Sequence, residues 1–477
     1  MIEIPFIGND YTSTSPNIDA ELSLNGFAVI NDPQAKSSLT WRRRSGYTLF
    51  ATVPQPNRKI YTTSTGRFFS VNGTNLHEIF AGGNTVLRNS GKPLNTLSGP
   101  VGIADNGRDL VIVDGVNGYR FNLSSNFFET ISDPDFPTSA THIDFQDGYL
   151  IANNPISDPQ GRFDISGVFD AANWNALDFG VAESSPDILN GLISTGNSLW
   201  LFGPDSFEVW RNTGASLFPF QRIDGVQSEI GLGAPYSLDR IDKTVFWLGS
   251  NEEGQGIVWM STSYQPVRIS HHALERKFAK FDRIDDAVGY CYQEGGHNFY
   301  VLSFPTANET WAYDTTTRFW HRRAFTNFNT NTDNRDLGVS FAQFMGTNYL
   351  ADYTNGNIYE IDPFQYTDNG NYIKVRRRSP PDKGVDRKYP NSFELDVQTG
   401  VGLVEGQGSD PKIWLRTSKD GGHNYGNPRR TTLGKIGKYR TRVRWNRLGV
   451  HRDRAYEVTI TDPVPFEIIG AYIGEAT

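Results

Sequence analysis

One pattern recurs seven times along the chain and constrains its fold more than any other feature. Each copy is a short apolar strand, a turn rich in Gly, Asn or Asp, and a second short strand. Successive copies begin 39 to 54 residues apart, near the ~40 to 50 residues of a four-stranded propeller blade. The copies are Phe68–Ile79, Leu110–Asn122, Tyr149–Ser166, Leu199–Arg211, Val245–Met260, Phe299–Asp314 and Tyr349–Asp362. The repeat predicts a ring of small sheets whose loops carry the specificity.

The composition favours the same class of fold. Aromatic residues make up 13% of the chain and there are 47 Gly, while amphipathic helical patterns are scarce, which indicates short strands joined by tight turns. With 477 residues the chain exceeds the ~250–300 at which single cores stop growing. We therefore expect an all-β protein: a β-propeller-like repeat domain of about six to seven blades, with or without an interruption, plus a C-terminal β-sandwich domain. Two sandwiches are the alternative, because short strands at similar spacing also build them.

Sequence patterns divide the chain into four parts. The three adjacent guanidinium groups of Arg42–Arg44 fit neither one strand face nor easy burial, which predicts an exposed loop. The basic run Arg376–Arg378 is followed by Pro380-Pro381, a pair that a central strand excludes. The expected parts are an N-terminal entry strand with a basic loop (1–50), a β-propeller domain (51–363), a basic Pro-containing linker (364–391) and a C-terminal β-sandwich domain (392–477).

Local patterns predict individual strands and turns in the propeller and in the sandwich. Consecutive apolar residues, as in Leu110–Val113 and Val245–Leu248, are typical of strands buried on both faces. Asn72-Gly73, Asp114-Gly115 and Asn355-Gly356 predict tight turns with positive φ. Sandwich strands are expected at Phe393–Val397, Ile413–Thr417, Tyr439–Trp445, Tyr456–Thr461 and Phe466–Ile473.

Charge is distributed unevenly along the chain. The net charge is -8, yet residues 374–477 carry 20 Lys+Arg against 12 Asp+Glu, and residues 1–373 carry 25 against 41. The basic part fits nucleic acid or an acidic protein surface, and an ordinary solvated face is the alternative. Cys291 is the single cysteine, so an intrachain disulfide is excluded. No apolar run approaches the ~20 residues of a membrane span and the N-terminus lacks a signal-peptide pattern, so we expect a soluble chain with no membrane-spanning segment.

Three C-terminal runs carry a resemblance to a known family. In order and spacing, Phe393–Gly402, Ile413–Gly422 and Arg444–Gly449 resemble the packaged-DNA stabilisation proteins, the tail hub or nozzle subunits of short-tailed bacteriophages. Further upstream, Ser45-Gly46-Tyr47 is similar to that family's N-terminal Pro-Gly signature, with Ser45 in place of the proline. The middle of the chain is similar in its blade-like rhythm alone.

The resemblance implies a structural role in the virion. It implies a homo-hexamer that forms a tube below the head–tail adaptor and portal ring, closes the head after packaging and lets double-stranded DNA leave without sequence specificity. Tail fibres or tailspikes and a tail needle or plug would attach around it. The implied place is the virion tail, after assembly in the bacterial host cytoplasm. It implies no catalytic residue and no cofactor.

The arginine clusters are then candidates for docking on a partner. Arginines grip DNA phosphates strongly, and a conduit must not hold what it conducts. We therefore expect the acidic part, residues 1–373, to face the lumen and the basic C-terminal domain to dock on an acidic partner ring. Long loops such as Phe325–Gly338 and Asp133–Phe136 are expected to reach the adaptor, fibres or needle. The candidate docking residues are Arg42, Arg43, Arg44, Arg376, Arg377, Arg378, Arg440, Arg442 and Arg444.

One further motif indicates a structural turn, and two other functions remain as alternatives. Ser418–Tyr425 resembles the Asp-box hairpin of sialidase propellers, which implies a structural turn built on Asp420, Gly421 and Tyr425. A glycan-processing or glycan-binding propeller is one alternative function; cleavage would need two carboxylates about 5–10 Å apart, and the sequence selects no pair among its 53 acidic residues. A monomeric propeller scaffold for protein binding is the second alternative.

Metal and nucleotide chemistry find little support in the sequence. His77-Glu78 lacks the second histidine of a zinc-protease helix. The adjacent His271-His272 would lie on opposite strand faces, with no nearby ligands at metal-binding spacing. No phosphate-binding loop ending in Gly-Lys-Ser or Gly-Lys-Thr occurs. We therefore expect no metal, cofactor or catalytic site.

Overall fold

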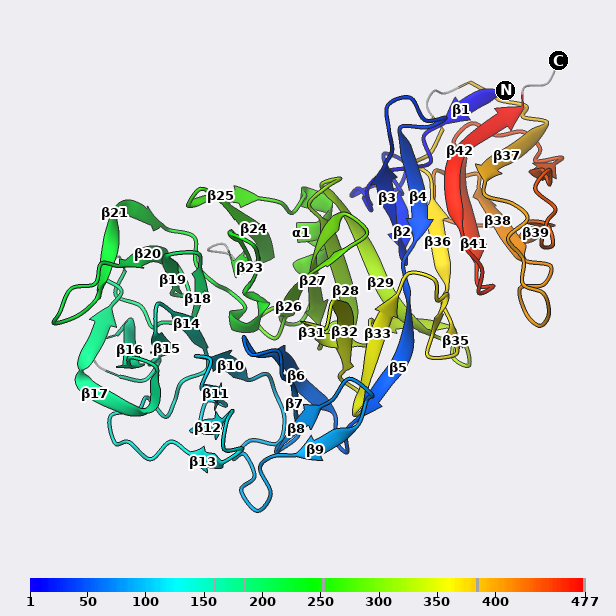
Figure 1. Cartoon of the computed structure of the whole chain (residues 1–477). Coiled ribbons are helices and arrows are strands. Elements are labelled where there is room, and N and C mark those ends of the chain that lie inside the picture. The colour runs from blue at the N-terminus through cyan, green and yellow to red at the C-terminus, as the bar shows by residue number, and fades with distance from the viewer. Residues whose placement is uncertain (158–159, 184, 251–253, 255, 383–385, 475–477) are drawn as a thin grey trace.

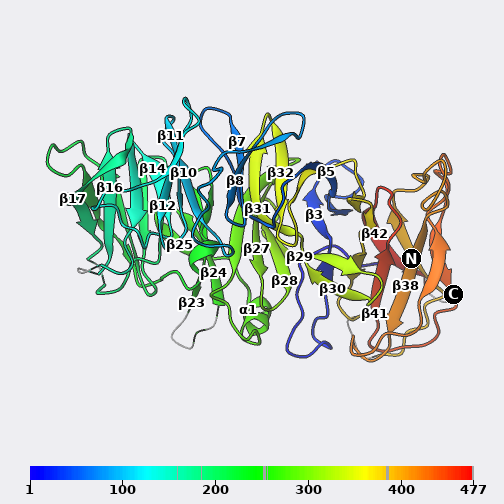
Figure 2. The same cartoon turned by 90° about the horizontal axis from the view of Figure 1, so that it is seen from below.

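The computed structural model describes residues 1–157, 160–183, 185–250, 254, 256–382 and 386–474. In this part of the chain, seven four-stranded antiparallel blades surround a central axis, and a two-sheet β-sandwich lies beside the ring (Figure 1). Viewed from below, the sandwich extends from one edge of the propeller, so that the molecule is elongated (Figure 2). The all-β prediction of a propeller plus a C-terminal sandwich is confirmed.

The first five blades follow each other along the chain. Each consists of four consecutive strands, and each strand pairs antiparallel with the next. The strands are β6 (Asn57–Thr62), β7 (Phe68–Asn72), β8 (Asn75–Ile79), β9 (Thr85–Leu87); β10 (Gly102–Asp105), β11 (Asp109–Val113), β12 (Gly118–Asn122), β13 (Phe128–Thr130); β14 (Ile143–Gln146), β15 (Tyr149–Asn153), β16 (Arg162–Gly167), β17 (Asp170–Val181); β18 (Gly191–Thr195), β19 (Ser198–Phe202), β20 (Phe207–Asn212), β21 (Phe220–Ser228); and β22 (Asp239–Ile241), β23 (Thr244–Ser250), β24 (Gly256–Thr262), β25 (Gln265–Arg268).

The sixth and seventh blades connect the ring to the rest of the chain. A 3-10 helix (Pro235–Ser237) precedes the fifth blade and the short helix α1 (His272–Phe278) follows it. The remaining propeller strands are β26 (Val288–Glu294), β27 (His297–Phe304), β28 (Glu309–Asp314), β29 (Phe319–Asn327) with the added β30 (Thr332–Arg335), and β31 (Gly338–Phe344), β32 (Thr347–Asp352), β33 (Asn357–Asp362), β5 (Gly46–Thr52), beside which lie β34 (Thr367–Asp368) and β35 (Asn371–Tyr372).

The N-terminal part of the chain closes the ring. Strand β5 is the outer strand of the seventh blade and pairs antiparallel with β33, from Gly46 opposite Asp362 to Thr52 opposite Asn357. The closing strand therefore begins at Gly46, before the predicted propeller boundary of residue 51. Joining the first and last parts of the repeat in one sheet ties the ring shut without a disulfide.

Aromatic and aliphatic side chains from adjacent blades form the propeller core. Trp247 of the fifth blade packs 5.2 Å from Phe202 of the fourth, measured between ring centroids, and Phe246 stacks on Tyr300 of the sixth at 5.1 Å. All four of these side chains are fully buried. Because every blade is covered on both faces by its neighbours, its inner strands read as continuous apolar runs.

Two of the three predicted glycine turns have positive φ. Gly73 has a φ of 51° and Gly115 a φ of 80°. Gly356 does not have positive φ; a Cβ there would lie 1.7 Å from the carbonyl oxygen of Val53. Glycine is required at residue 356 because the backbone just after β5 passes too close to leave room for a side chain. The prediction of positive φ was therefore wrong for this residue.

The sandwich is built from both ends of the chain. One sheet has the order β3-β4-β42-β37-β40 with β1 on β42, and the other has the order β2-β36-β41-β38-β39. Strand β2 also forms one parallel pair with β29, Leu24 opposite Arg322, so the second sheet continues into the sixth blade. The strands are β1 (Ile2–Ile4), β2 (Leu22–Leu24), β3 (Gly26–Ile30), β4 (Leu39–Arg43), β36 (Val375–Arg378), β37 (Ser392–Val397), β38 (Lys412–Ser418), β39 (Arg429–Thr432), β40 (Val443–Asn446), β41 (Ala455–Ile460) and β42 (Glu467–Gly474).

This arrangement corrects two of the expected parts. Residues 1–45 supply four sandwich strands instead of a separate entry segment, and β36 of the expected linker is a central strand between β2 and β41. The sequence pattern missed both because the pairing partners lie far away in the chain: Trp41 is opposite Ile468. The core between the sheets includes Trp41 and Phe393, with Phe393 stacked 4.6 Å from Tyr456.

Candidate functional site

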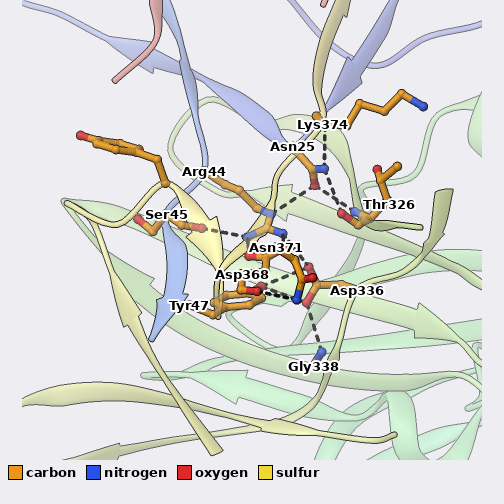
Figure 3. A network of polar contacts seen from close by, with 12 residues as sticks. Asn25, Arg44, Ser45, Tyr47, Thr326, Asp336, Gly338, Asp368, Asn371 and Lys374 are labelled. Atoms are coloured by element: carbon orange, nitrogen blue, oxygen red, sulfur yellow. Dashed lines mark hydrogen bonds and ion pairs between the residues drawn. The ribbon is translucent and has the colours of Figure 1, made fainter. Parts of the chain in front are cut away.

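A buried polar network joins the propeller to the sandwich (Figure 3). Its centre is Arg44, in the turn between β4 and β5, which is 3% exposed. The guanidinium donates two hydrogen bonds to the carboxylate of Asp368, at 2.9 and 2.6 Å, and lies 3.7 Å from an oxygen of Asp336. Tyr47 donates its hydroxyl to Asp336 at 2.9 Å and lies under the guanidinium.

Asn25 extends the network into three segments of the chain. It accepts from the Nε of Arg44 at 3.1 Å and donates to the carbonyls of Ala324 and Lys374, both at 2.9 Å. It lies in the turn between β2 and β3 with a φ of 56°, a conformation that Asn tolerates better than most residues. The side chain of Lys374 in turn reaches Asp333 at 3.2 Å. The network thus fixes where the chain passes between the two domains.

Electrostatics keep this junction charged although it is buried. Burial alone would lower the pKa of Arg44, but the carboxylates of Asp368 and Asp336 outweigh burial and hold that pKa well above its usual value. When a buried cation is held by two carboxylates and further hydrogen bonds, removing one partner leaves a buried charge uncompensated. Its role is to hold the domains together.

Three predicted docking arginines are buried within the chain, so they do not present a surface to a partner. Arg43 donates to the carbonyls of Asp462 and Val464 at 2.9 and 2.6 Å, and burial lowers its pKa to about 9. Arg377 donates to the carbonyl of Phe6 at 2.9 Å. Together with Arg44, these residues correct the expected exposed loop at 42–44. These three arginines link segments that are far apart in the sequence, because they bond to backbone carbonyls and carboxylates from the other end of the chain.

The other arginines lie nearer the surface. Arg42 is exposed, with Glu467 at 3.5 Å. Arg442 forms two hydrogen bonds to the carboxylate of Glu394, at 2.8 and 2.6 Å, and Arg444 lies 4.0 Å from the same carboxylate. Only the last part of the predicted strand 439–445 is β40, so Arg440 is exposed in the preceding turn.

The remaining two arginines of the β36 run differ in their contacts. Arg378 donates to Glu457 at 2.7 Å and lies 4.5 Å above the ring of Tyr425. Arg376 is half-buried, opposite Leu24 in the β2–β36 pair. Alternation along β36 therefore points Arg377 inward and its two neighbours to the other face.

The turn at Asp420 has contacts of the Asp-box kind. Asp420 accepts a hydrogen bond from the backbone N–H of Asn424 at 2.9 Å and from the hydroxyl of Ser418 at 2.6 Å. These donors lower the pKa of Asp420. Gly421 has a φ of 68°, and the half-buried ring of Tyr425 lies between Arg378 and Arg416. The turn anchors the end of β38.

The propeller axis encloses a cavity of about 420 Å³, lined by the inner strands of the blades. Asp144 pairs with Arg240 there and accepts from the backbone N–H of Ser194 at 2.7 Å. Asp239 accepts from the backbone N–H of Cys291 at 2.6 Å. Burial lowers the pKa of Lys59, which also lines the cavity. With Arg58, Lys59 and Arg240 against Asp144 and Asp239, the lining is polar and of mixed charge.

A second cavity, of about 370 Å³, lies between the N-terminal segment and α1. Burial raises the pKa of Asp10 in its wall to about 6 and lowers the pKa of His271, the N-cap of α1, to about 4. Perturbed pKa values in a cleft mark candidate sites, but here burial at the domain junction accounts for both shifts. In the described part of the chain, no three His, Cys, Asp or Glu side chains are grouped to hold a metal ion.

Sequence reasoning missed the junction and found part of the surface. Asn25 and Asp336 are ordinary polar residues between strands and Asp368 ends the short strand β34, and only the fold brings them to Arg44. The one unusual signal in the sequence is the Arg42–Arg44 triplet, whose charge predicts exposure although Arg43 and Arg44 are buried. In the residues that the structure describes, no helix is long and apolar enough to cross a membrane.

Comparison with protein families gives matches over nearly the whole chain. A model described as bacteriophage P22 Gp10, beta-propeller, matches residues 2–365. A model described as bacteriophage P22 Gp10, beta-sandwich, matches residues 385–474. No curated protein matches the chain.

Solved structures with similar topology are distant. A chain of the mitotic checkpoint complex is 11% identical, with 70% of this chain and 95% of that chain covered and a TM-score of 0.45. The Neurospora crassa Pan2 WD40 domain is 9% identical, with 66% and 95% covered and a TM-score of 0.41. The extracellular domain of the putative hybrid two component system BT3049 from B. thetaiotaomicron is 10% identical, with 84% and 48% covered and a TM-score of 0.43. Likenesses at this level carry no functional argument.

Proposed function

Because this chain belongs to the bacteriophage P22 Gp10 family of structural phage proteins that stabilise packaged DNA, we propose that it is the tail hub, or nozzle, of a short-tailed phage. As a homo-hexamer below the head–tail adaptor and portal ring, it closes the head after packaging and forms the ejection channel. Tail fibres or tailspikes and a needle or plug attach to it. It assembles in the host cytoplasm and acts mechanically, without a catalytic step.

The size of the propeller cavity is the observation that carries this proposal. One helical turn of B-DNA is about 34 Å long and ~20 Å wide, a volume on the order of 10,000 Å³, whereas the cavity on the propeller axis holds about 420 Å³. The duplex does not fit through one disc. A chain that retains and conducts DNA must therefore enclose it between several copies, and a ring of heterologous contacts that closes does so.

The distribution of charge between the domains supports a lumen lined by the propellers. The propeller residues 46–373 carry 21 Lys+Arg against 36 Asp+Glu, and the sandwich residues 1–45 and 374–477 carry 24 against 17. A negatively charged wall repels phosphates, so that DNA slides instead of binding. The basic sandwich, including the surface arginines Arg42, Arg440, Arg442 and Arg444, then docks on an acidic protein surface.

The test combines assembly with DNA retention. The chain is mixed with the portal–adaptor complex of the same phage and weighed by native mass spectrometry, with class averages from electron microscopy of the same sample. The expected result is a hexamer with an open lumen near ~20 Å. Phage particles made without the chain are expected to contain DNA that DNase degrades, while particles with it protect their DNA. The proposal would be refuted if the chain stayed monomeric and did not bind the portal–adaptor complex, and if DNA were equally protected in particles with and without the chain.

A further inference from the structure

Two loops of the sandwich form one exposed surface, here called the sandwich tip and made of residues 399–409 and 433–441. The loops are bonded to each other: the N–H of Gly437 donates to the carbonyl of Gly400 at 3.0 Å, and the hydroxyl of Thr399 donates to the carbonyl of Tyr439 at 2.9 Å. The N–H of Gly400 also donates to the carbonyl of Leu433 at 3.1 Å. The tip is therefore one preformed surface.

The sandwich tip exposes large apolar side chains close together. Val404 is 85% exposed, Tyr439 73%, Ile436 58% and Leu403 39%. Single exposed apolar residues are normal, but a group of them rimmed by polar residues marks an interaction surface. An aromatic residue within such a group is typical of binding hot spots. The free chain leaves this surface uncovered.

The rim of the sandwich tip is basic. Lys435, Lys438 and Arg440 are exposed, and none of them has an ion-pair partner among the residues that the structure describes. The acids nearby are Glu405, which is exposed, Asp410, which is bonded to Lys412 and Thr432 and also lies within the field of Lys435, and Asp462, which accepts from Gln407 and from the N–H of Lys412. The charge left over is positive, so a partner with negative charge and apolar groups fits the tip.

Such a surface exists on the fourth blade of the propeller, around the β19–β20 turn. The N–H of Asp205 donates weakly to the carboxylate of Asp187, at 3.4 Å. Ile188 beside them is 41% exposed. The segment after β21, which contains the exposed Glu229, is tied to the same turn by a 2.9 Å bond from the N–H of Leu232 to the carbonyl of Gly203. We name these residues the acidic blade face.

The acidic blade face also lacks compensating charge. Within the described residues, no Lys or Arg forms an ion pair with Asp187, Asp205 or Glu229. Burial raises the pKa of Asp187, and the carboxylate of Asp205 adds to this. Carboxylates that repel each other in the free chain gain more from an incoming cation than carboxylates that are already paired.

The two surfaces cannot meet within one chain. The fourth blade (β18–β21) lies across the ring from the sandwich, at the far end of the elongated molecule (Figure 1). Complementary surfaces at opposite ends of one chain meet between copies, and such heterologous contacts build rings when the rotation closes. This is the geometry that the hub needs.

We propose that the sandwich tip of one copy docks on the acidic blade face of the next copy, with the lysines and Arg440 against the carboxylates and the apolar side chains against Ile188. The proposal rests on the ring inferred above and names the contact that closes it. In such a ring every sandwich tip faces an acidic blade face. All copies therefore have the same orientation, because two tips or two acidic blade faces would repel each other.

The test is a mixed-isotope cross-linking experiment on the assembled complex. Full-length chains with natural and ¹⁵N isotope content are mixed, assembled on the portal–adaptor complex and treated with a carbodiimide, which joins lysine to carboxylate at contact distance. The expected products link Lys435 or Lys438 to Asp187, Asp205 or Glu229, in peptides of mixed isotope content. Links from these lysines to adaptor peptides, or solely to carboxylates of the same copy, overturn the proposal.

Charge reversal gives the second measurement. The variant Lys435→Glu/Lys438→Glu is expected to lower ring occupancy on the adaptor at least about tenfold, and adding Asp205→Lys is expected to restore much of it. Lys243→Glu, an exposed site in the propeller, is the matched control and leaves occupancy unchanged. Thermal melting of each free chain checks that folding is intact. Wild-type-like occupancy of the double variant overturns the proposal.

The outcomes separate this contact from the function itself. If the chain forms a hexamer and protects DNA but these cross-links are absent, the contact is wrong and the hub stands. If no ring forms with the wild-type chain, the hub fails first. Because the ring is stabilised by charge, occupancy is also expected to fall as ionic strength rises.

Discussion

The propeller and the sandwich are both β-sheet domains, yet they are assembled in opposite ways. In the first six blades every strand pairs with its neighbour in sequence, and one outside strand, β5, closes the seventh. In the sandwich, strands from residues 1–45 lie beside strands from residues beyond 374 in both sheets. The propeller is thus a series of local pairings, whereas the complete sandwich contains strands from both ends of the chain. Where the chain crosses between them, the buried Arg44 network lies beside apolar packing, in which Phe27 of β3 contacts Phe299 of the sixth blade.

The largest effect is expected from separating the two ends. Residues 374–477 alone lack β1 to β4, so Phe466 loses its contact with Trp41 and both sheets lose strands. We expect this fragment to show no cooperative thermal transition by circular dichroism. Fusing residues 1–45 to residue 374 through a short linker restores the missing strands and is expected to restore the transition. Cooperative melting of the fragment alone would show that the sandwich does not depend on the N-terminal strands.

The next effect concerns the junction. Arg44→Ala leaves Asp368 and Asp336 buried without their cation, and removing one partner of a buried pair costs about 3–5 kcal/mol. Urea unfolding is expected to show this loss. Arg42→Ala removes an exposed arginine from the same triplet and is expected to change stability by less than about 1 kcal/mol. Equal losses for the two variants would contradict the assignment of Arg44 as the junction residue.

The same contrast explains what the sequence could predict. All seven predicted copies are the second and third strands of the seven blades, because these strands are buried on both faces and read as apolar runs. Outer strands such as β17 carry exposed side chains and gave no clear pattern. The domain boundaries were missed at the N-terminus because β4 pairs with β42, more than four hundred residues away, and no local periodicity encodes such a partner.

The candidate surfaces were predictable to a lesser degree. Composition separated a basic from an acidic part, but it did not distinguish Arg377, which is fully buried against the carbonyl of Phe6, from the exposed Arg440. An arginine pattern reports charge and not burial, since the partners of a buried guanidinium are backbone carbonyls and carboxylates that lie far away in the sequence. The exposed apolar residues of the sandwich tip lie in a loop rich in Gly, where a sequence pattern gives no reason to expect a group.

Acid is expected to act on the propeller through His142, which lines the central cavity. Burial lowers the pKa of His142 to about 4, and the positive charge of Lys59 adds to the shift. The folded chain therefore binds fewer protons than the unfolded chain between about pH 4 and 6.5, so stability is full above pH 6.5 and is lost as the pH falls. The 2.5-unit difference corresponds to about 3 kcal/mol. His142→Gln is expected to flatten this part of the pH profile in urea unfolding; identical profiles for wild type and His142→Gln would contradict it.

Asp10, at the junction, is expected to respond in the opposite sense. Its folded pKa of about 6 lies above the usual 3.8, so the folded chain binds more protons between these values. The stability that Asp10 contributes through this raised pKa is present below about pH 4 and is lost as the pH rises through 6. The free energy of unfolding at pH 7, taken relative to its value at pH 4, is therefore expected to be higher in Asp10→Asn than in wild type. The increase is at most about 3 kcal/mol. A profile that moves in the same direction as that of His142→Gln would show that burial does not control Asp10.

The smallest effect tests the contact between the Asp420 turn and the N-terminal segment. Gly422 and Gly437 both have positive φ, 96° and 79°, so Ala costs each about 1–2 kcal/mol in the backbone. A Cβ on Gly422 would lie 2.7 Å from the Cβ of the buried Ala20, while nothing lies within 4 Å of one on Gly437. Gly422→Ala is therefore expected to cost about 1 kcal/mol more than Gly437→Ala in urea unfolding, because packing another methyl against a fixed neighbour is unfavourable. Shortening the fixed neighbour with Ala20→Gly is expected to recover this excess. Equal costs for the two alanine variants would mean that the N-terminal segment yields to the turn, and that the sandwich is less dependent on its first strands than the fold indicates.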